Sequence, residues 1–272
     1  MIAELRMGIA ALILAPIAVW RAQNELRNLG RDHWVLLGIS GLLLCLHFAS
    51  WISSIGMTTI TSSVVLVTTA PLWVAILAPI FLKEKLSWLT VLGLMVTLSG
   101  GFLVGLSNSC ELSHGSLTCD LRITPSSSQE LVGNGLALAG AWFSAGYLLV
   151  GRRLRHELSL LTYTFIVYSF AAMGLALILV IFNQQVLGYP WIVYAIGATL
   201  ALVPQIIGHS SFNWALKYLP ASFVSVALLG EPIGTSILAV IFLSEVPTLL
   251  EMLGGAIILF GIYISSRSTF SG

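Results

Sequence analysis

Three polar side chains recur at four-residue spacing within the apolar stretch from residue 191 to 215. They are Gln205, His209 and Asn213, and this spacing places them along one face of a helix. A polar group inside a long apolar helix is costly, so it usually faces the interior of a helix bundle and often marks a pathway. We therefore predict that this face lines a binding site. The alternative is that these side chains only form hydrogen bonds between helices.

A second pair, His47 and Trp51, has the same spacing in the apolar stretch from residue 34 to 55. We predict that this pair lines the same site from another helix. Trp73 and Trp142 are further candidates, because an indole ring can contact a flat or apolar substrate. Ordinary packing is the alternative for both tryptophans.

Glu231 lies in another apolar stretch and is followed by Pro232, which removes a backbone donor and loosens the helix beside the carboxyl group. A carboxyl group in apolar surroundings can take up and release a proton during a cycle. We predict a role for Glu231 in proton coupling or substrate binding. A neutral, hydrogen-bonded structural role is the alternative.

Two of the three cysteines, Cys110 and Cys119, lie nine residues apart in a polar segment. We predict a loop-closing disulfide between them if this segment faces an oxidising compartment. The sequence contains no metal-ligand spacing, phosphate-binding loop, nucleophile elbow or zinc-protease helix. We therefore expect no catalytic residue, no metal, no cofactor and no ATP-driven step.

The composition indicates an integral membrane protein. Hydrophobic residues make up 57% of the chain, charged residues only 8%, and the mean hydropathy is +0.97. A soluble domain carries about 25% charged residues, so this inventory cannot cover a water-facing surface. A basic stripe with interleaved aromatic residues is absent, which argues against a nucleic-acid partner.

Nine apolar stretches approach the length of about 20 residues that a spanning helix needs. They cover residues 1–20, 34–55, 61–82, 89–106, 131–151, 160–182, 191–215, 222–243 and 248–265. A signal peptide is the alternative for the first stretch. Ten of the twelve Lys and Arg residues fall on alternate loops of one side. The positive-inside rule therefore predicts a cytoplasmic C-terminus, and the odd number of spans then places Met1 outside.

The chain repeats itself at an offset of 161 residues. Residues 76–84 read ILAPIFLKE and residues 237–245 read ILAVIFLSE, and 237 − 76 = 161. Shared Pro, Glu and Gly residues in one register carry more weight than shared Leu or Ile. The register aligns Pro71 with Pro232, Gly93 with Gly254, and Gly100 with Gly261.

The two copies have opposite predicted orientations. Lys83 and Lys85 flank Glu84, whereas the equivalent Glu245 has no flanking lysine. Inverted repeats with a site at their interface are a recurrent transporter architecture. The second copy contains five spans and the first only four, so we expect the first copy to lack its first helix. A genuine nine-span protein is the alternative.

Several motifs resemble those of EamA-type transporters of the drug/metabolite transporter superfamily. Residues 211–232 read SFNWALKYLPASFVSVALLGEP and resemble the second repeat of that family. The first-repeat motifs TTAP at residues 68–71 and FLKE at residues 81–84 resemble the same pattern. Arg6 is similar to the Arg that begins the second helix of the family. This resemblance covers nearly the whole chain apart from residues 107–130.

The resemblance implies an all-α integral membrane fold with two inverted five-helix repeats, of which nine spans are present and ten are expected. It divides the chain into a first repeat (1–106), an extracytoplasmic loop (107–130) and a second repeat (131–272). It also implies a central cavity bordered chiefly by the stretches 34–55, 61–82, 191–215 and 222–243.

We therefore expect a multi-pass protein of the cell membrane, embedded in lipid, that exports small organic metabolites such as amino acids by alternating access. Proton coupling is open, as is the oligomeric state. The alternatives are an integral-membrane enzyme that uses His47, His209 and Glu231 as acid and base groups, and a structural subunit of a membrane complex.

Overall fold

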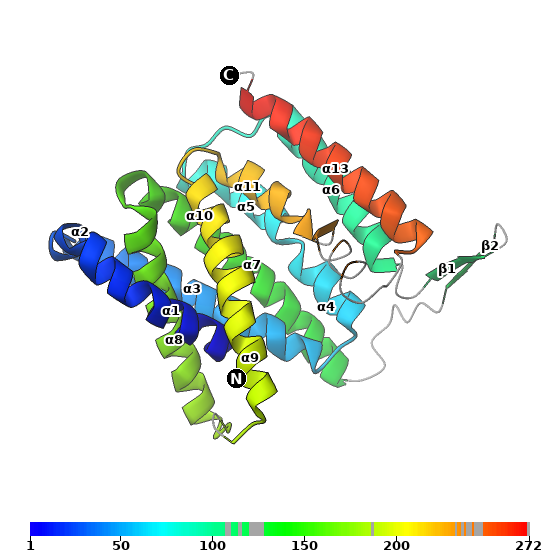
Figure 1. Cartoon of the computed structure of the whole chain (residues 1–272). Helices are drawn as coiled ribbons and strands as arrows, with labels where there is room; N and C mark the ends of the chain where they lie inside the picture. Colours follow the sequence, from blue (N-terminus) through cyan, green and yellow to red (C-terminus); the bar gives the residue numbers. More distant parts are fainter. Residues whose placement is uncertain are drawn as a thin grey trace. The chain divides into compact units, whose positions relative to one another are not determined.

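The structure is a computed structural model, and it describes residues 1–106, 110–113, 116–119, 128–185, 188–231, 233–234, 237, 241 and 247–270. Figure 1 shows a helical protein with one short β-hairpin. The elements are α1 (Ile2–Arg21), α2 (Gln23–Arg27), α3 (Arg31–Ile55), α4 (Ile60–Val67), α5 (Ala70–Phe81), α6 (Trp88–Leu106), β1 (Cys110–Ser113), β2 (Ser116–Cys119), α7 (Ser128–Glu157), α8 (Leu160–Ile181), α9 (Trp191–Leu200), η1 (Ala201–His209), α10 (Ser210–Ala215), α11 (Ala221–Leu228) and α13 (Leu249–Phe270).

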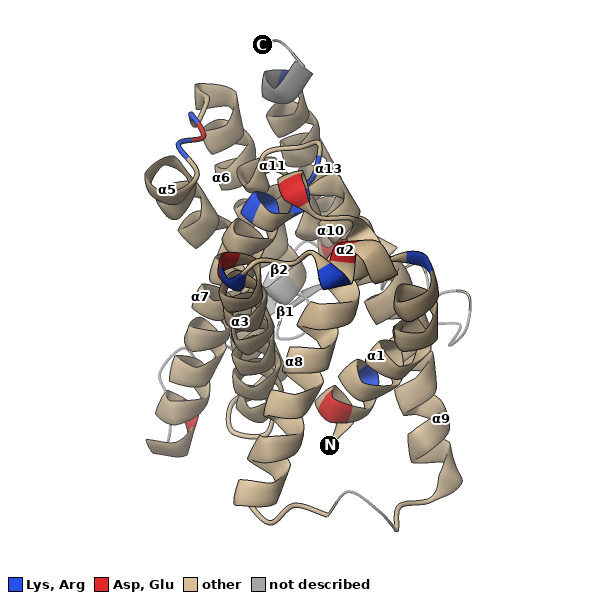
Figure 2. Cartoon of the chain, turned by 90° about the vertical axis from the view of Figure 1, so that its left-hand side faces the viewer, with Lys and Arg blue, Asp and Glu red and all other residues tan. Residues whose placement is uncertain are grey.

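The all-α integral membrane class predicted from composition is confirmed. Within the described ranges, six helices or helix runs are long and apolar enough to cross a membrane, and Trp88–Val104 is a shorter apolar helix. Figure 2 shows long uncharged stretches, and α8 and α9 carry no charged residue along their lengths. Many large apolar side chains are exposed, as expected for surfaces that face lipid rather than water.

The chain forms two compact units. Unit 1 consists of Met1–Ile52 and Gly146–Leu219, and unit 2 consists of Ser53–Ala145 and Pro220–Gly272. Unit 1 contains α1, α2, α8, α9, η1 and α10, with most of α3 and the second part of α7. Unit 2 contains α4, α5, α6, α11 and α13, with the first part of α7.

The predicted stretch 61–82 is not one continuous helix. It is divided into α4 and α5 by a turn at Thr68 and Thr69, just before Pro71. Proline cannot donate the backbone hydrogen bond that a continuous helix requires at that position. The hydroxyl groups of Thr68 and Thr69 donate to the carbonyl oxygens of Val65 and Leu66, at 2.9 and 2.6 Å. They thereby satisfy backbone acceptors beside the break.

The second repeat contains a break at the equivalent place. α4 covers residues 60–67 and α11 covers residues 221–228, so both ends differ by 161 (221 − 60 = 161; 228 − 67 = 161). A turn at Leu229 and Gly230 follows α11. The offset read from the sequence therefore predicts where both helices end. Most of the remaining predicted span lies outside the described residues.

The stretch 191–215 is helical throughout, as predicted, but its hydrogen bonding changes twice. It begins as α9, continues as the π-helix η1 and ends as α10. Pro204 lies inside η1, where it interrupts the regular α-helical ladder. A π-helical turn is wider than an α-helical turn and is often found at functional sites. Gln205 and His209 both belong to this turn.

Within unit 2, α6 and α13 lie side by side and make their closest approaches at glycines (Figure 1). An added Cβ at Gly93 would lie 2.6 Å from the Gly261 carbonyl oxygen, and one at Gly100 would lie 2.7 Å from that of Gly254. As α6 advances from 93 to 100, its partner position on α13 falls from 261 to 254, so the two helices are antiparallel. Gly93 is equivalent to Gly254, and Gly100 to Gly261. The repeat symmetry therefore exchanges the two contacts, as expected for an inverted repeat.

Candidate substrate-binding site

Unit 1 gathers five of the residues that the sequence singled out. His47 and Trp51 come from α3, Gln205 and His209 from η1, and Asn213 from α10. Gln205 and Asn213 are completely buried, whereas His47, Trp51 and His209 are half-buried. The side chains belong to two connected groups, one around Arg6 and one around Asn213.

Arg6 of α1 reaches η1 through a direct side-chain contact. Its Nε donates a hydrogen bond of 2.7 Å to Oε1 of Gln205. The guanidinium group also lies 4.6 Å from the centre of the Phe48 ring, in a cation–π arrangement. Phe48 is buried on α3, so Arg6 is held between an amide oxygen and an aromatic face.

Asn213 is the centre of a buried hydrogen-bond network. Its side-chain amide exchanges hydrogen bonds of 2.7 and 2.9 Å with the hydroxyl group of Tyr147. Its Nδ2 also lies 3.5 Å from the hydroxyl oxygen of Tyr168. That hydroxyl group contacts Ser210 Oγ at 3.2 Å and the backbone carbonyl oxygen of Gln205 at 3.5 Å. The network therefore joins α7, α8 and α10 to the π-helical turn.

Aromatic rings connect the two groups. The His209 ring lies 5.6 Å from Phe48 and 6.5 Å from Tyr147, measured between ring centres. His47 and Trp51 stack at 5.9 Å with an interplanar angle of 19°. Phe48 and His209 are equivalent positions of the repeat, because 209 − 48 = 161. Two symmetry-related residues thus contact each other within unit 1.

The remaining predicted residues lie in unit 2. The rings of Trp73 and Trp142 meet edge to face at 5.1 Å, and Trp73 Nε1 lies 3.4 Å from Thr69 Oγ1 at the break between α4 and α5. Glu231 is exposed and follows α11. Pro232 and the side chains of Cys110 and Cys119 lie outside the described residues. In the part of the chain that is described, no group of three or more His, Cys, Asp or Glu side chains could hold a metal ion.

The sequence did not assign Arg6 or Phe48 to the candidate site. Arg6 was noted for its resemblance to a family residue, not as a partner of Gln205, although a cation in an apolar stretch is itself a signal. The repeat offset aligns Phe48 with His209, but Phe48 was not predicted to line the site because phenylalanine is common in apolar helices. Tyr147 and Tyr168 carry hydroxyl groups that need buried partners, which could have linked them to Asn213.

Arginines of α7 tie this site to the corner between α7 and α8. Arg155 is buried, and its Nε donates to the backbone carbonyl oxygen of Asn213 at 2.9 Å, while another nitrogen donates to the carbonyl oxygen of Leu158. Arg152 donates to the carbonyl oxygen of Leu216 at 2.6 Å. Cationic side chains commonly bind the last carbonyl groups of a helix, here the end of α10.

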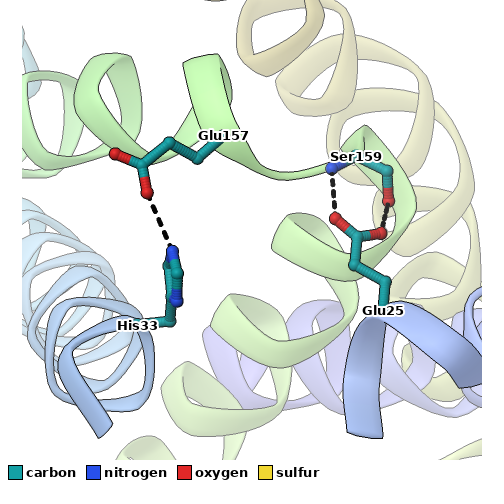
Figure 3. Close-up of polar contacts among 4 residues, drawn as sticks. All are labelled: Glu25, His33, Glu157 and Ser159. Carbon is teal, nitrogen blue, oxygen red and sulfur yellow. Dashed lines mark hydrogen bonds and ion pairs between the residues drawn. The ribbon is translucent and has the colours of Figure 1, made fainter. Parts of the chain in front are cut away.

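Glu25 of α2 binds the start of α8 (Figure 3). Its carboxylate accepts hydrogen bonds from the Ser159 backbone N–H at 2.7 Å and from the Ser159 hydroxyl group at 2.5 Å. The Thr162 hydroxyl group also donates to it at 2.5 Å. Burial alone raises the pKa of Glu25, but these hydrogen bonds and Arg155 outweigh burial, so its pKa is lowered overall. His33 and Glu157 form a second contact across the same corner, at 2.8 Å.

The EamA-like transporter family matches residues 1–106 and 131–267. This chain belongs to that family. The family resemblance seen in the sequence is thereby confirmed. Because its helices are apolar and its family consists of transporters, the protein is a multi-pass membrane transporter that acts on small molecules in a lipid environment.

Several curated proteins are similar to this EamA-like protein. An uncharacterized transporter of Synechocystis is 25% identical over 89% of this chain and 70% of its own length. The uncharacterized transporter YdfC of Bacillus subtilis is 26% identical over 95% of this chain and 78% of its own length. A protein of Streptantibioticus cattleyicolor named as a probable terminal-alkyne amino-acid exporter is 25% identical over 75% of this chain and 63% of its own.

The fold of the EamA-like chain is also found in a solved structure. A protein known from its crystal structure superposes with a TM-score of 0.76 at 15% sequence identity, over 98% of this chain and 88% of its own. At this level of identity the likeness concerns the fold alone.

Proposed function

We propose that this protein is a secondary transporter that exports small organic metabolites, such as amino acids, by alternating access. The observation that supports it best is the buried polar site of unit 1, in which Arg6, Gln205 and Asn213 lie among otherwise apolar helices. Polar and ionisable residues within a membrane are costly and are usually retained for function. The name of the S. cattleyicolor relative supports amino acids as the first substrates to try.

The repeat supports alternating access as the mechanism. Equivalent helices end at equivalent residues, and the glycine contacts of α6 and α13 are exchanged by the repeat symmetry. In inverted-repeat transporters the two repeats can exchange conformations, and this exchange opens the same substrate site first to one side of the membrane and then to the other. We further propose that the C-terminus is cytoplasmic, on the distribution of Lys and Arg over the predicted loops.

Proton coupling through Glu231 is a separate proposal. Glu231 is an exposed acidic residue that follows the turn at the end of α11, and a carboxyl group can take up and release a proton during a cycle. The driving force is then a proton gradient, and protons enter in exchange for the exported metabolite. The substrate site of unit 1 and the proton site need not be the same.

The test is flux in proteoliposomes over a panel of metabolites at two opposite pH gradients. We expect concentration-dependent flux of at least one panel member that requires an intact bilayer, whereas an enzyme would turn over its substrate in detergent as well. Glu231→Gln should remove the dependence on the pH gradient, and Glu157→Gln, at the α7–α8 corner, serves as the charge-matched control. A pH dependence unchanged in Glu231→Gln would eliminate Glu231 as the coupling residue, and flux of no substrate would refute transport.

A further inference from the structure

The side-chain amide of Gln205 has one satisfied and one unsatisfied end. Oε1 accepts the hydrogen bond from Arg6 Nε. Because a guanidinium group only donates hydrogen bonds, the amide cannot be turned over without placing two donors face to face. Nε2 therefore carries the two remaining N–H groups, and among the described residues no acceptor reaches it, although Gln205 is completely buried.

A buried donor without an acceptor is rare, because its loss of hydration is not compensated. Such a group needs an acceptor that the described side chains do not supply, either an ordered water or a bound ligand. The polar groups close to Gln205 are used elsewhere: the Tyr168 hydroxyl group contacts the Gln205 backbone, Ser210 and Asn213. The acceptor for Nε2 must therefore come from outside this network.

The backbone around Gln205 is also irregular. Gln205 directly follows Pro204 and lies in the middle of the π-helix η1. A π-helical turn in an otherwise α-helical span has a conformational cost and is typically kept where it positions functional groups. The irregular backbone and the unsatisfied amide are independent observations, and both point to the same residue.

Arg6 determines which acceptor fits. Its guanidinium group bears a positive charge beside Gln205 Oε1 and is oriented by the face of Phe48. An acceptor that reaches Nε2 therefore comes close to this cation. A singly charged carboxylate balances one guanidinium group and accepts through two oxygens. A phosphate monoester carries close to two charges near neutral pH, and only one of them would be balanced here.

We propose that Arg6 and Gln205 form the subsite that binds the carboxylate group of the transported molecule. One carboxylate oxygen accepts from Gln205 Nε2, and the charge of Arg6 stabilises the anion. This inference rests on the proposed transport function and specifies which end of the substrate the protein recognises. Nε2 is covered in the present structure, so the carboxylate enters in a state of the cycle in which the site is open.

The first experiment compares matched ligands that differ only at the carboxyl group. Full-length protein in proteoliposomes is loaded with a transported amino acid, and competitors are added as the free acid, the carboxamide and the phosphate monoester of the corresponding alcohol. We expect the acid to compete about tenfold better than the amide, the order of magnitude for a hydrogen bond to a charged group. Acid and amide competing equally would overturn the subsite, even though transport itself stands. A phosphate ester that competes best would replace the carboxylate with a phosphate.

The second experiment uses Gln205→Glu. A carboxylate at this position keeps an acceptor for Arg6 Nε and places a built-in anion where the substrate carboxylate would bind. We expect the purified variant to fold and to keep or raise its own thermal stability in detergent. The concentration of free acid that gives the same increase in unfolding temperature should be at least tenfold higher than for wild type. Ser211→Ala, on the exposed face of α10 next to the site, is the matched control and should respond to the acid as wild type does.

These measurements distinguish failure of the carboxylate subsite from failure of the proposed transport function. A Gln205→Glu variant that is stabilised by the acid as strongly as wild type would mean that Gln205 is structural, and the subsite would be wrong. Arg6→Gln provides a second variant, with an expected loss of the acid-over-amide preference. If wild type transports no panel member and none stabilises it in detergent, the proposed function fails, and this inference fails with it.

Discussion

The packing of α6 against α13 gives the sharpest test of the structure, because neighbouring glycines of one helix have opposite environments. A Cβ added at Gly100 would lie 2.7 Å from the Gly254 carbonyl oxygen and 2.8 Å from the Ile258 backbone nitrogen. A Cβ added at Gly101 would have no described atom within 4 Å. The same substitution, glycine to alanine, should therefore have opposite effects at adjacent residues.

The magnitude follows from the contact distances. Ordinary van der Waals contact for a Cβ begins at 3.4 Å, so Gly100→Ala requires α13 to retreat by about 0.7 Å (3.4 − 2.7 = 0.7). Overpacking of this kind costs about 1–3 kcal/mol. Alanine gains up to about 1 kcal/mol of helix propensity over glycine, which offsets part of that cost. We expect Gly100→Ala to be about 1–2 kcal/mol less stable than wild type, and Gly101→Ala to be equal or up to about 1 kcal/mol more stable.

The assay is unfolding of purified protein in mixed micelles by titration with sodium dodecyl sulfate, followed by circular dichroism. Gly254→Ala changes the partner glycine of the same contact and should match Gly100→Ala, because its Cβ would lie 2.7 Å from the Gly100 carbonyl oxygen. If Gly100→Ala and Gly101→Ala unfold at the same detergent fraction, the close antiparallel contact of α6 with α13 is wrong.

Three further predictions concern other parts of the chain. Glu25→Gln should lower the free energy of unfolding near neutral pH by about 0.5–1 kcal/mol, the scale of a charge at an exposed helix start. Because folding lowers the pKa of Glu25, this difference from wild type should be present above the ordinary glutamate pKa of about 4.3 and disappear as the pH falls through the lower folded pKa. A stability difference that persists in acid would contradict this prediction. Tyr147→Phe should lower the free energy of unfolding by about 0.6–1.7 kcal/mol, the range for interhelical hydrogen bonds in membranes, because Asn213 loses its two shortest side-chain hydrogen bonds. An unchanged unfolding transition would refute the network. Cys110 and Cys119 are direct backbone partners across the β1–β2 hairpin, and this register is compatible with a disulfide. Mass spectrometry of non-reduced and reduced digests should find the two cysteines linked, and free thiols throughout would exclude the bond.

The sequence predicted the helices well because a spanning helix depends on local composition. The stretch 191–215 was predicted to its exact residues, and the offset of 161 was sufficient to relate the ends of α4 and α11. The break before Pro71 was missed because proline is tolerated in many membrane helices, and whether it divides one depends on neighbouring hydroxyl groups such as those of Thr68 and Thr69.

The site was predicted in part, for a related reason. The spacing of Gln205, His209 and Asn213 identifies a polar face, but it does not state what that face meets. The partner of Gln205 is Arg6, 199 residues away, and a single sequence contains no signal for a contact over that distance. Likewise, Trp73 and Trp142 were predicted as possible substrate contacts, and the structure places them against each other in unit 2 rather than in the cluster around His209.

The contact of Phe48 with His209 has a consequence for how such a protein can diverge. When both repeats were identical, a residue at this position would have faced its own copy across the symmetry axis, so any change would have been made twice in one contact. After the two copies became independent, each could change alone, and here one carries a phenyl ring and the other an imidazole ring at 5.6 Å. Arg6 stacks on the phenyl ring. The Phe48–His209 pair is thus an asymmetric contact between equivalent positions of a repeated sequence, and a self-facing position is where a duplicated protein can acquire new side-chain chemistry with the fewest substitutions.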